Sequence, residues 1–183
     1  MTDALRLAYA DPPYLGGGAL YAKHHPDALA WDDPEAHRAL VGRLCEEYPD
    51  GWAMSASSPS LRTILPMCPE DTRVASWVKP FCSFKPGVPV AYAWEPVLFR
   101  GGRRRGRGEA TIRDWIACPI TLRRGLTGAK PRAVCRWIFD LLGAEPTDTM
   151  DDLFPGTGAV AAAWADFAGQ RSPLPALPLE ATL

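Results

Sequence analysis

Segments typical of buried strands alternate with segments typical of helices along most of the chain. Apolar runs predict strands at residues 5–10, 51–57, 72–78, 90–99 and 149–154. Helices are predicted at residues 34–48, 60–67, 130–142 and 159–168, and a flexible loop at residues 16–31. The alternation predicts an α/β fold with a mostly parallel sheet, helices on both faces, and ligands at the carboxyl ends of the strands.

The length and composition indicate one domain. A chain of 183 residues with 47% apolar and 22% charged residues is long enough to bury a substantial core. We predict a domain over residues 1–170 and a proline-rich tail over residues 171–183. The sequence shows neither a secretory signal nor an apolar run long enough to cross a bilayer, which predicts a cytoplasmic protein without membrane association.

The cysteines predict free thiols rather than a metal site. They are scattered singly, without the C-x-x-C spacing of zinc or redox motifs. Their positions are Cys45, Cys68, Cys82, Cys118 and Cys135. Of the three histidines, His24 and His25 are adjacent, so their side chains diverge. We therefore predict no metal.

The first predicted strand ends at Asp11-Pro12-Pro13-Tyr14, where two prolines prevent it from continuing and make the turn rigid. An exocyclic amine of adenine or cytosine is a poor nucleophile, because its lone pair is delocalised into the ring. Asp11 and the carbonyl group of Pro12 are placed to accept its two hydrogens, and Tyr14 offers a flat face to an extruded base. Alternatively, the prolines only end a strand and Tyr14 fills the core.

A second motif, residues 152–158 with the sequence D-L-F-P-G-T-G, lies between the last predicted strand and the last predicted helix. Glycines after a strand allow a nucleoside to approach bare backbone, although such turns also serve close packing alone. The motif lacks the third glycine and the downstream acidic residue of a dinucleotide site.

Arginines are concentrated in one glycine-rich stretch, although the net charge of the chain is only -1. We predict a basic, substrate-facing insertion over residues 100–126. Within it, Arg103, Arg104, Arg105 and Arg107 are predicted to contact nucleic-acid phosphates. The alternative is a solvated loop.

The two motifs together resemble the amino-methyltransferases of DNA, which act on adenine N6 or cytosine N4 and combine D-P-P-Y with F-x-G-x-G. The matches are residues 11–14 and 154–158. Their order is similar to the circularly permuted order of the beta-type members and of related RNA adenosine methyltransferases. Lys130-Pro131 resembles the K-P pair that lies beside the methionine part of the cofactor, and residues 94–99 resemble the family's late E-P-hydrophobic-hydrophobic strand.

The resemblance implies a Rossmann-like methyltransferase fold, circularly permuted in its motif order and reduced at the C-terminus. It implies that Asp11, Pro12, Pro13 and Tyr14 hold the target amine and base. It also implies S-adenosylmethionine as the only cofactor. The residues that would bind it are Asp152, Phe154, Gly156, Thr157, Gly158, Lys130 and Pro131.

The expected function is therefore adenine-specific DNA methylation, with DNA as the partner. Cytosine N4, RNA adenine and a non-catalytic nucleic-acid-binding subunit of the same fold remain alternatives. Methylation of a protein glutamine uses a related motif with a small residue or asparagine in place of Asp11, which disfavours that reaction. Because no separate target-recognition domain fits in the chain, a homodimer or a separate specificity partner is a further expectation.

Overall fold

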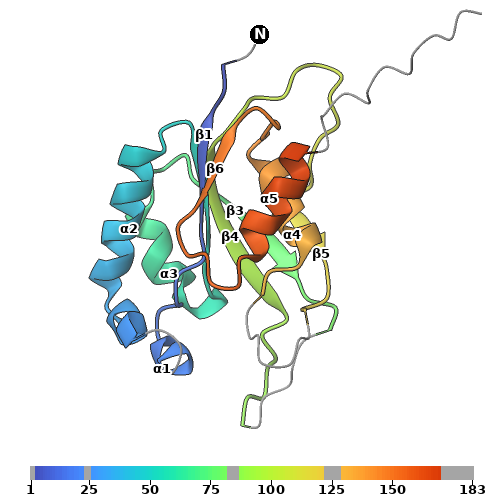
Figure 1. The fold of residues 1–183 in the computed structure, drawn as a ribbon. Helices are drawn as coiled ribbons and strands as arrows, with labels where there is room; N and C mark the ends of the chain where they lie inside the picture. The colour runs from blue at the N-terminus through green and yellow to red at the C-terminus, as the bar shows by residue number, and fades with distance from the viewer. Residues whose placement is uncertain (1–2, 23–25, 82–86, 122–128, 170–183) are drawn as a thin grey trace, which may run out of the picture.

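The computed structural model describes residues 3–22, 26–81, 87–121 and 129–169, which form one mixed sheet with helices on both faces (Figure 1). The strands are β1 (Arg6–Ala10), β2 (Gly51–Ser55), β3 (Arg73–Val78), β4 (Trp94–Gly101), β5 (Trp115–Ala117) and β6 (Thr149–Asp152). The α-helices are α1 (Gly18–Tyr21), α2 (Pro34–Glu47), α3 (Leu61–Ile64), α4 (Arg132–Leu141) and α5 (Ala159–Gly169). The 3₁₀ helices are η1 (Pro26–Asp32), η2 (Ser58–Ser60) and η3 (Leu65–Met67).

The strand order is β5-β3-β4-β2-β1-β6. β1 is parallel to β2 and β6, and β3 is parallel to β5, whereas β4 is antiparallel to β2 and β3. Hence β1, β2, β3 and β6 end at one edge of the sheet, which we call the carboxyl edge, and β4 begins there. At the opposite edge, the amino edge, those strands begin and β4 ends. The predicted α/β architecture is confirmed, with β4 as the antiparallel exception.

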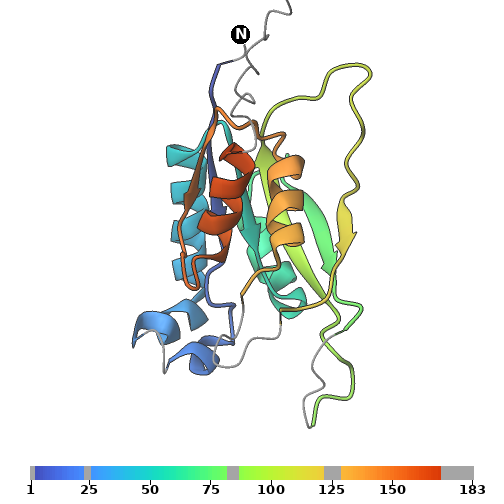
Figure 2. The same ribbon diagram turned by 45° about the vertical axis from the view of Figure 1, so that its right-hand side comes forward.

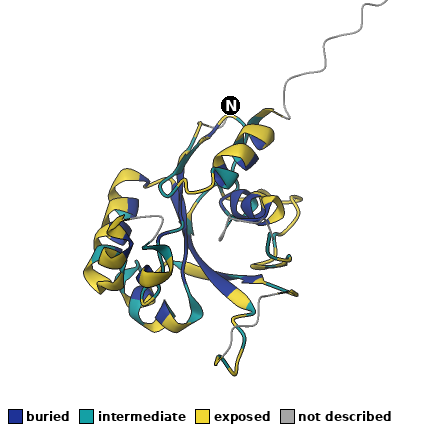
Figure 3. Ribbon diagram, turned by 60° about the horizontal axis from the view of Figure 1, so that its bottom comes forward, coloured by how far each residue is buried: buried dark blue, intermediate teal, exposed yellow. Residues whose placement is uncertain are grey.

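Helices cover both faces of the sheet, and their buried residues lie toward it (Figures 2 and 3). Each face carries a separate apolar core. Leu7 and Tyr9 of β1 pack with residues of α4 and α5, whereas Ala8 and Ala10 pack with residues of α2. Alternate residues of one strand thus enter opposite cores, as expected where both faces of a sheet are covered. All four side chains are completely buried, so β1 is a rigid support for the turn that follows it.

The predicted flexible loop over residues 16–31 is wrong, because much of this segment forms α1 and η1. The two helices lie close together at Gly18, whose backbone N–H donates to Asp32 Oδ1 at 2.9 Å. A Cβ atom at Gly18 would lie only 2.5 Å from the carbonyl oxygen of Ala28. Gly18 therefore allows α1 and η1 to approach each other closely. From the sequence, the run of three glycines instead indicates a flexible loop.

The strands also differ from the prediction in their boundaries and in one additional member. β4 begins at Trp94, so residues 90–93 belong to the connection before it, and β5 was not predicted at all. β5 has three residues with an exposed, half-buried and exposed pattern, which is too short to show a periodicity. The predicted tail, residues 171–183, lies outside the described residues.

Within the described part of the chain, no helix combines the length and apolar character needed to cross a membrane.

Candidate active site

The D-P-P-Y turn leaves β1 at the carboxyl edge. Pro12 is buried, whereas Asp11, Pro13 and Tyr14 are half-buried. The Tyr14 hydroxyl donates to Asp11 Oδ1 at 3.0 Å, and the backbone N–H of Gly17 donates to the Tyr14 carbonyl at 2.7 Å. These bonds hold the carboxylate and the aromatic ring in one turn. In the described residues, Asp11 Oδ2 and the Pro12 carbonyl oxygen have no hydrogen-bond donor.

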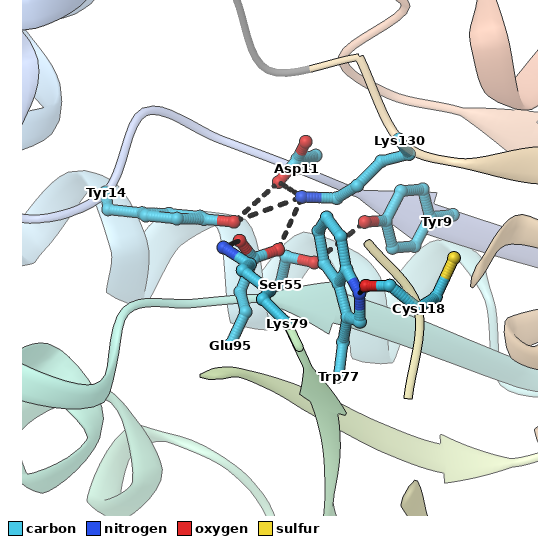
Figure 4. A network of polar contacts seen from close by, with 9 residues as sticks. All are labelled: Tyr9, Asp11, Tyr14, Ser55, Trp77, Lys79, Glu95, Cys118 and Lys130. Atoms are coloured by element: carbon cyan, nitrogen blue, oxygen red, sulfur yellow. Dashed lines mark hydrogen bonds and ion pairs between the residues drawn. The ribbon is translucent and has the colours of Figure 1, made fainter. Parts of the chain in front are cut away.

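Lys130 brings a third charged group to this turn from the segment before α4. Its ammonium group lies 2.9 Å from Asp11 Oδ1, 2.5 Å from Glu95 Oε1 and 3.2 Å from the Tyr14 hydroxyl (Figure 4). Its side chain is only 7% exposed. Pro131, the next residue, is the N-cap of α4, and its carbonyl accepts from the backbone N–H groups of Val134 and Cys135.

Glu95 and Lys79 complete the row of charges. Glu95 is on β4 and is 7% exposed; its Oε2 accepts from Lys79 Nζ at 2.9 Å, and Lys79 directly follows β3. Both ammonium groups also lie over the ring of Trp77, with Lys79 Nζ at 4.6 Å and Lys130 Nζ at 5.5 Å from its centroid. Sequence reasoning noted Glu95 only as part of a strand and missed Lys79. The available signal for Lys79 was its position: it is a charged residue directly after a predicted strand, where ligand-binding residues are expected in an α/β fold.

The charges alter one another's proton affinity. Burial raises the pKa of Glu95, but the ammonium groups of Lys130 and Lys79 outweigh it and hold this pKa at about 2. Burial lowers the pKa of Lys130, but the carboxylates of Asp11 and Glu95 outweigh it and hold this pKa well above the usual value. For Asp11, burial raises the pKa, Lys130 opposes the rise, and Glu95 adds to it. Asp11 is therefore easier to protonate than Glu95.

The glycine turn lies beside Asp11, because β6 is paired with β1. Leu153 donates from its backbone N–H to the Tyr9 carbonyl at 3.0 Å, which ties the turn to the end of β1. The ring of Phe154 packs edge-on against Trp31 at a centroid distance of 5.0 Å. Gly156 and Gly158 have φ angles of +43° and +73°, a region that favours glycine, and Thr157 between them is exposed.

Two observations at this turn fit a bound polar ligand. Asp152 Oδ2 is buried without a hydrogen-bond partner in the described chain, while Oδ1 accepts from the Phe154 N–H at 3.3 Å. Space beside the glycines is open, since a Cβ at Gly158 would meet no atom within 4 Å and one at Gly156 only the Phe154 carbonyl oxygen at 3.6 Å. A ligand with a hydroxyl or ammonium donor would satisfy Asp152.

The arginine stretch lies elsewhere. It follows β4 and therefore starts from the amino edge, at the opposite end of the strands from Asp11. The Arg103 guanidinium lies 2.6 Å from Asp148 Oδ1 and is 17% exposed, and Arg105 donates to the Asp140 carbonyl at 2.8 Å. Arg104 and Arg107 are exposed. The structure thus does not bring these arginines to the residues that the sequence predicted as catalytic.

A cavity of about 390 Å³ is present beside the arginine stretch. Its charged lining residues have both signs: Arg103, Arg104, Arg105, Arg136, Glu109, Asp140 and Glu145. Gly101 and Gly102, which precede the arginines, have positive φ angles and leave no room for a Cβ against the backbone of Asp50 and Leu142, respectively. These two glycines therefore serve close packing rather than flexibility.

Neither a family model nor a curated protein matches the sequence. Solved structures, however, match over most of it. M1.HpyAVI in its complex with SAM gives a TM-score of 0.60 at 16% identity, covering 90% of this chain and 79% of that one. TTHA0409 from Thermus thermophilus, provisionally named a DNA modification methylase, gives 0.55 at 17% identity over 90% and 78%, and its complex with S-adenosyl-L-methionine gives 0.52 at 18% identity over the same shares. The chain shares their fold.

Within this fold, the structure groups the predicted residues into two neighbouring sets. Asp11, Tyr14 and Lys130 form one set, and residues 152–158 form the other. Lys130, predicted to contact the cofactor, has its side chain in the first set, and Pro131 is the N-cap of the helix that the sequence predicts to begin at residue 130. Across the described ranges, no cluster of three or more histidine, cysteine or acidic side chains is arranged to hold a metal ion.

Proposed function

We propose that this protein is an S-adenosylmethionine-dependent methyltransferase that modifies the exocyclic amine of a nucleic-acid base, with adenine N6 in DNA as its target. The observation that carries the proposal is the pairing of two adjacent strands, β1 and β6. One ends in a carboxylate with a free oxygen, Asp11 Oδ2, and the other ends in a glycine turn with a buried acceptor, Asp152 Oδ2. The likeness to structures solved with S-adenosylmethionine supports the choice of cofactor.

The residues of the turn after β6 fit that cofactor. Asp152 would accept a hydrogen from one of its hydroxyl or ammonium groups, and Gly156 and Gly158 leave space where any side chain would intrude. Phe154, held against Trp31, and Thr157 border the same turn. When bound, the cofactor supplies an electrophilic methyl group.

The residues after β1 act on the target amine. Asp11 Oδ1 is occupied by Lys130 and Tyr14, which leaves Oδ2 and the Pro12 carbonyl to accept hydrogen bonds from the two amine N–H groups, one of which loses its proton when nitrogen gains the methyl group. Accepting both hydrogens moves electron density back to nitrogen and directs its lone pair. Pro12 and Pro13 keep the two acceptors in fixed positions, and Tyr14 stacks on the extruded base. Positioning supplies most of the rate enhancement in such a transfer.

We further propose DNA as the partner, with exposed arginines as phosphate contacts. Arg104, Arg105 and Arg107 are the candidates, because Arg103 is held by Asp148. Their place at the amino edge separates them from Asp11, so they would bind a part of the nucleic acid away from the target base. A second copy or another protein that supplies sequence recognition remains part of the proposal.

The test is nucleoside mass spectrometry on DNA and RNA from cells that express the protein, with Asp11→Ala as the matched control. N6-methyladenine in DNA is expected only with the parent protein. N4-methylcytosine, or N6-methyladenosine in RNA, would replace the proposed target by one of its alternatives. If neither polymer gains a methylated base and S-adenosylmethionine does not raise the melting temperature, the protein is a non-catalytic binder of the same fold.

A further inference from the structure

All hydrogen-bond donors of the Lys130 side chain are used within the protein. An ammonium group has three N–H donors, and Lys130 Nζ has three acceptors within 3.2 Å, on Asp11, Glu95 and Tyr14. Binding the carboxylate of a cofactor would require Lys130 to give up one of these bonds. The position of Lys130 in the structure thus differs from the cofactor contact that the family resemblance implies.

We infer that Lys130, Glu95 and Lys79 are positioning residues that act through Asp11, and that Lys130 does not bind the cofactor. Lys130 holds Oδ1 of Asp11 so that Oδ2 faces the target amine, Glu95 holds Lys130, and Lys79 holds Glu95. This inference rests on the proposed function, because it concerns how Asp11 is prepared for the same reaction.

Glu95 is the fixed point of this row of charges. Asp11 and Lys130 both lie in connecting segments, whereas Glu95 lies in β4, between β2 and β3 in the middle of the sheet. Each of its two oxygens has an ammonium partner, at 2.5 Å and 2.9 Å, and its side chain is 7% exposed. Glu95 thus holds Lys130 against a rigid strand, and Lys130 in turn contacts Asp11 from a segment far away in the sequence (Figure 4).

The row also has a balanced charge. Its two carboxylates and two ammonium groups alternate in the order Lys79, Glu95, Lys130 and Asp11, so each buried charge has a neighbour of opposite sign. Removing one partner of a buried pair leaves an uncompensated charge. Replacing Lys130 should therefore favour the neutral form of Asp11, and replacing Glu95 should favour its ionised form.

Other titratable groups also face Asp11. Asp152 and Asp11 repel each other across the paired ends of β1 and β6, and burial is the main cause that raises the pKa of Asp152. Among the residues that the structure describes, the neutral groups that interact with Asp11 are the tyrosines Tyr9, Tyr14 and Tyr21 and the thiol of Cys135. All of these groups are still present in variants of Lys130 and Glu95. A difference in the Asp11 pKa between such variants therefore reports the effect of the row of charges.

The first measurement is the pKa of the Asp11 carboxyl, followed by carbon NMR of protein labelled at aspartate, which needs no activity. We expect Lys130→Met to move this pKa upward and Glu95→Gln to move it downward relative to the parent. Arg132→Met is the matched control, since it removes a charge two residues away whose partner is Asp166 on the protein surface. It should leave the Asp11 pKa in place.

The second measurement is the affinity for S-adenosylmethionine by calorimetry, beside turnover. Lys130→Met should retain the parent's affinity for S-adenosylmethionine, while kcat falls on the order of tenfold or more. Losses of this size are typical when a residue that orients a functional group, without touching the ligand itself, is replaced. The acid limb of its pH–rate profile should move to higher pH, because Asp11 must be ionised to accept a hydrogen, and that of Glu95→Gln to lower pH. Lys130→Arg should restore part of the rate.

The outcomes separate the two proposals. A parent protein that binds S-adenosylmethionine but methylates no base would contradict the proposed function, while the Asp11 pKa in the variants would still test the row of charges. Loss of cofactor binding in Lys130→Met with an unchanged Asp11 pKa would overturn the inference. Lys130 would then be a cofactor-binding residue, as the family resemblance implies. If Lys130→Met does not fold, an unchanged Asp11 pKa in Glu95→Gln overturns it as well.

Discussion

The carboxyl and amino edges of the sheet both gather charged side chains, but they use them differently. At the carboxyl edge the charged residues are buried or half-buried and leave acceptors without partners, namely Asp11 Oδ2 and Asp152 Oδ2. At the amino edge, Asp148 accepts from Arg103 and from the backbone N–H groups of Leu5 and Glu145, so its carboxylate is fully used. Charge density alone therefore does not distinguish the two edges, whereas carboxylate oxygens without a hydrogen-bond donor do: within the described residues they occur at the carboxyl edge in Asp11 and Asp152, but not in Asp148.

The largest effect is expected at the carboxyl edge. In the proposed reaction, Asp11→Ala removes the acceptor that matters most in the transition state, so turnover should fall about a hundredfold or more, equivalent to about 3 kcal/mol of barrier. Affinity for S-adenosylmethionine should change little, since the glycine turn is intact. Methyl transfer from labelled cofactor, measured beside the melting temperature, checks both. Full activity in a folded Asp11→Ala protein would refute the catalytic role of this residue.

A substitution at the amino edge should instead lower the stability of the protein. Asp148→Ala removes the acceptor of the Arg103 Nη2 group and of two backbone N–H groups, although Arg103 keeps its contacts with the Asp3 carbonyl and Glu145, and it should lower the free energy of unfolding by about 2 kcal/mol. Turnover per folded molecule should stay near the parent value. Urea denaturation and kinetics on the same sample provide the measurement. If Asp148→Ala lost turnover but not stability, the division between the two edges would be wrong.

The sequence predicted the carboxyl edge better than the amino edge, for a physical reason. A buried strand that ends in Asp-Pro-Pro-Tyr can be recognised locally, because apolar periodicity and proline geometry act over a few residues. The partners of Asp11 could not be predicted in this way. Glu95 and Lys130 are 84 and 119 positions away from Asp11, and only the pairing of strands across the sheet brings them together.

The arginine stretch is a case in which the local pattern leaves a structural role unrecognised. Arginines interleaved with glycines are typical of flexible phosphate-binding loops, but Gly102 lies against the Leu142 backbone and Arg103 against Asp148. Both contacts are made between segments far apart in the sequence. The local pattern therefore did not indicate that Arg103 has a structural role.

A smaller effect is expected at the glycine turn. Gly156→Val adds a branched side chain into the open space beside the turn and should weaken S-adenosylmethionine binding about tenfold, or about 1.4 kcal/mol. Gly156→Ala is the matched control, because it imposes the same positive φ on a smaller side chain. Calorimetry should show a larger loss for valine than for alanine. Equal affinity of both variants and the parent would exclude this turn as the cofactor site.

The smallest effect on the chemistry is expected from the exposed arginines, which sharpen the comparison by testing whether the amino edge has any function beyond stability. Replacing Arg104, Arg105 and Arg107 by alanine should reduce the slope of log affinity for DNA against log salt by roughly 0.7–0.9 for each arginine that binds a phosphate, because fewer counterions are released. The matched triple variant with lysine keeps the charges and should keep most of the slope. Turnover at saturating DNA should be unchanged in both, since none of the three side chains reaches the carboxyl edge. Fluorescence anisotropy with a labelled duplex over a series of salt concentrations measures the slope. An unchanged slope in the alanine variant would show that DNA approaches the carboxyl edge without touching this stretch, and the amino edge would then serve the fold alone.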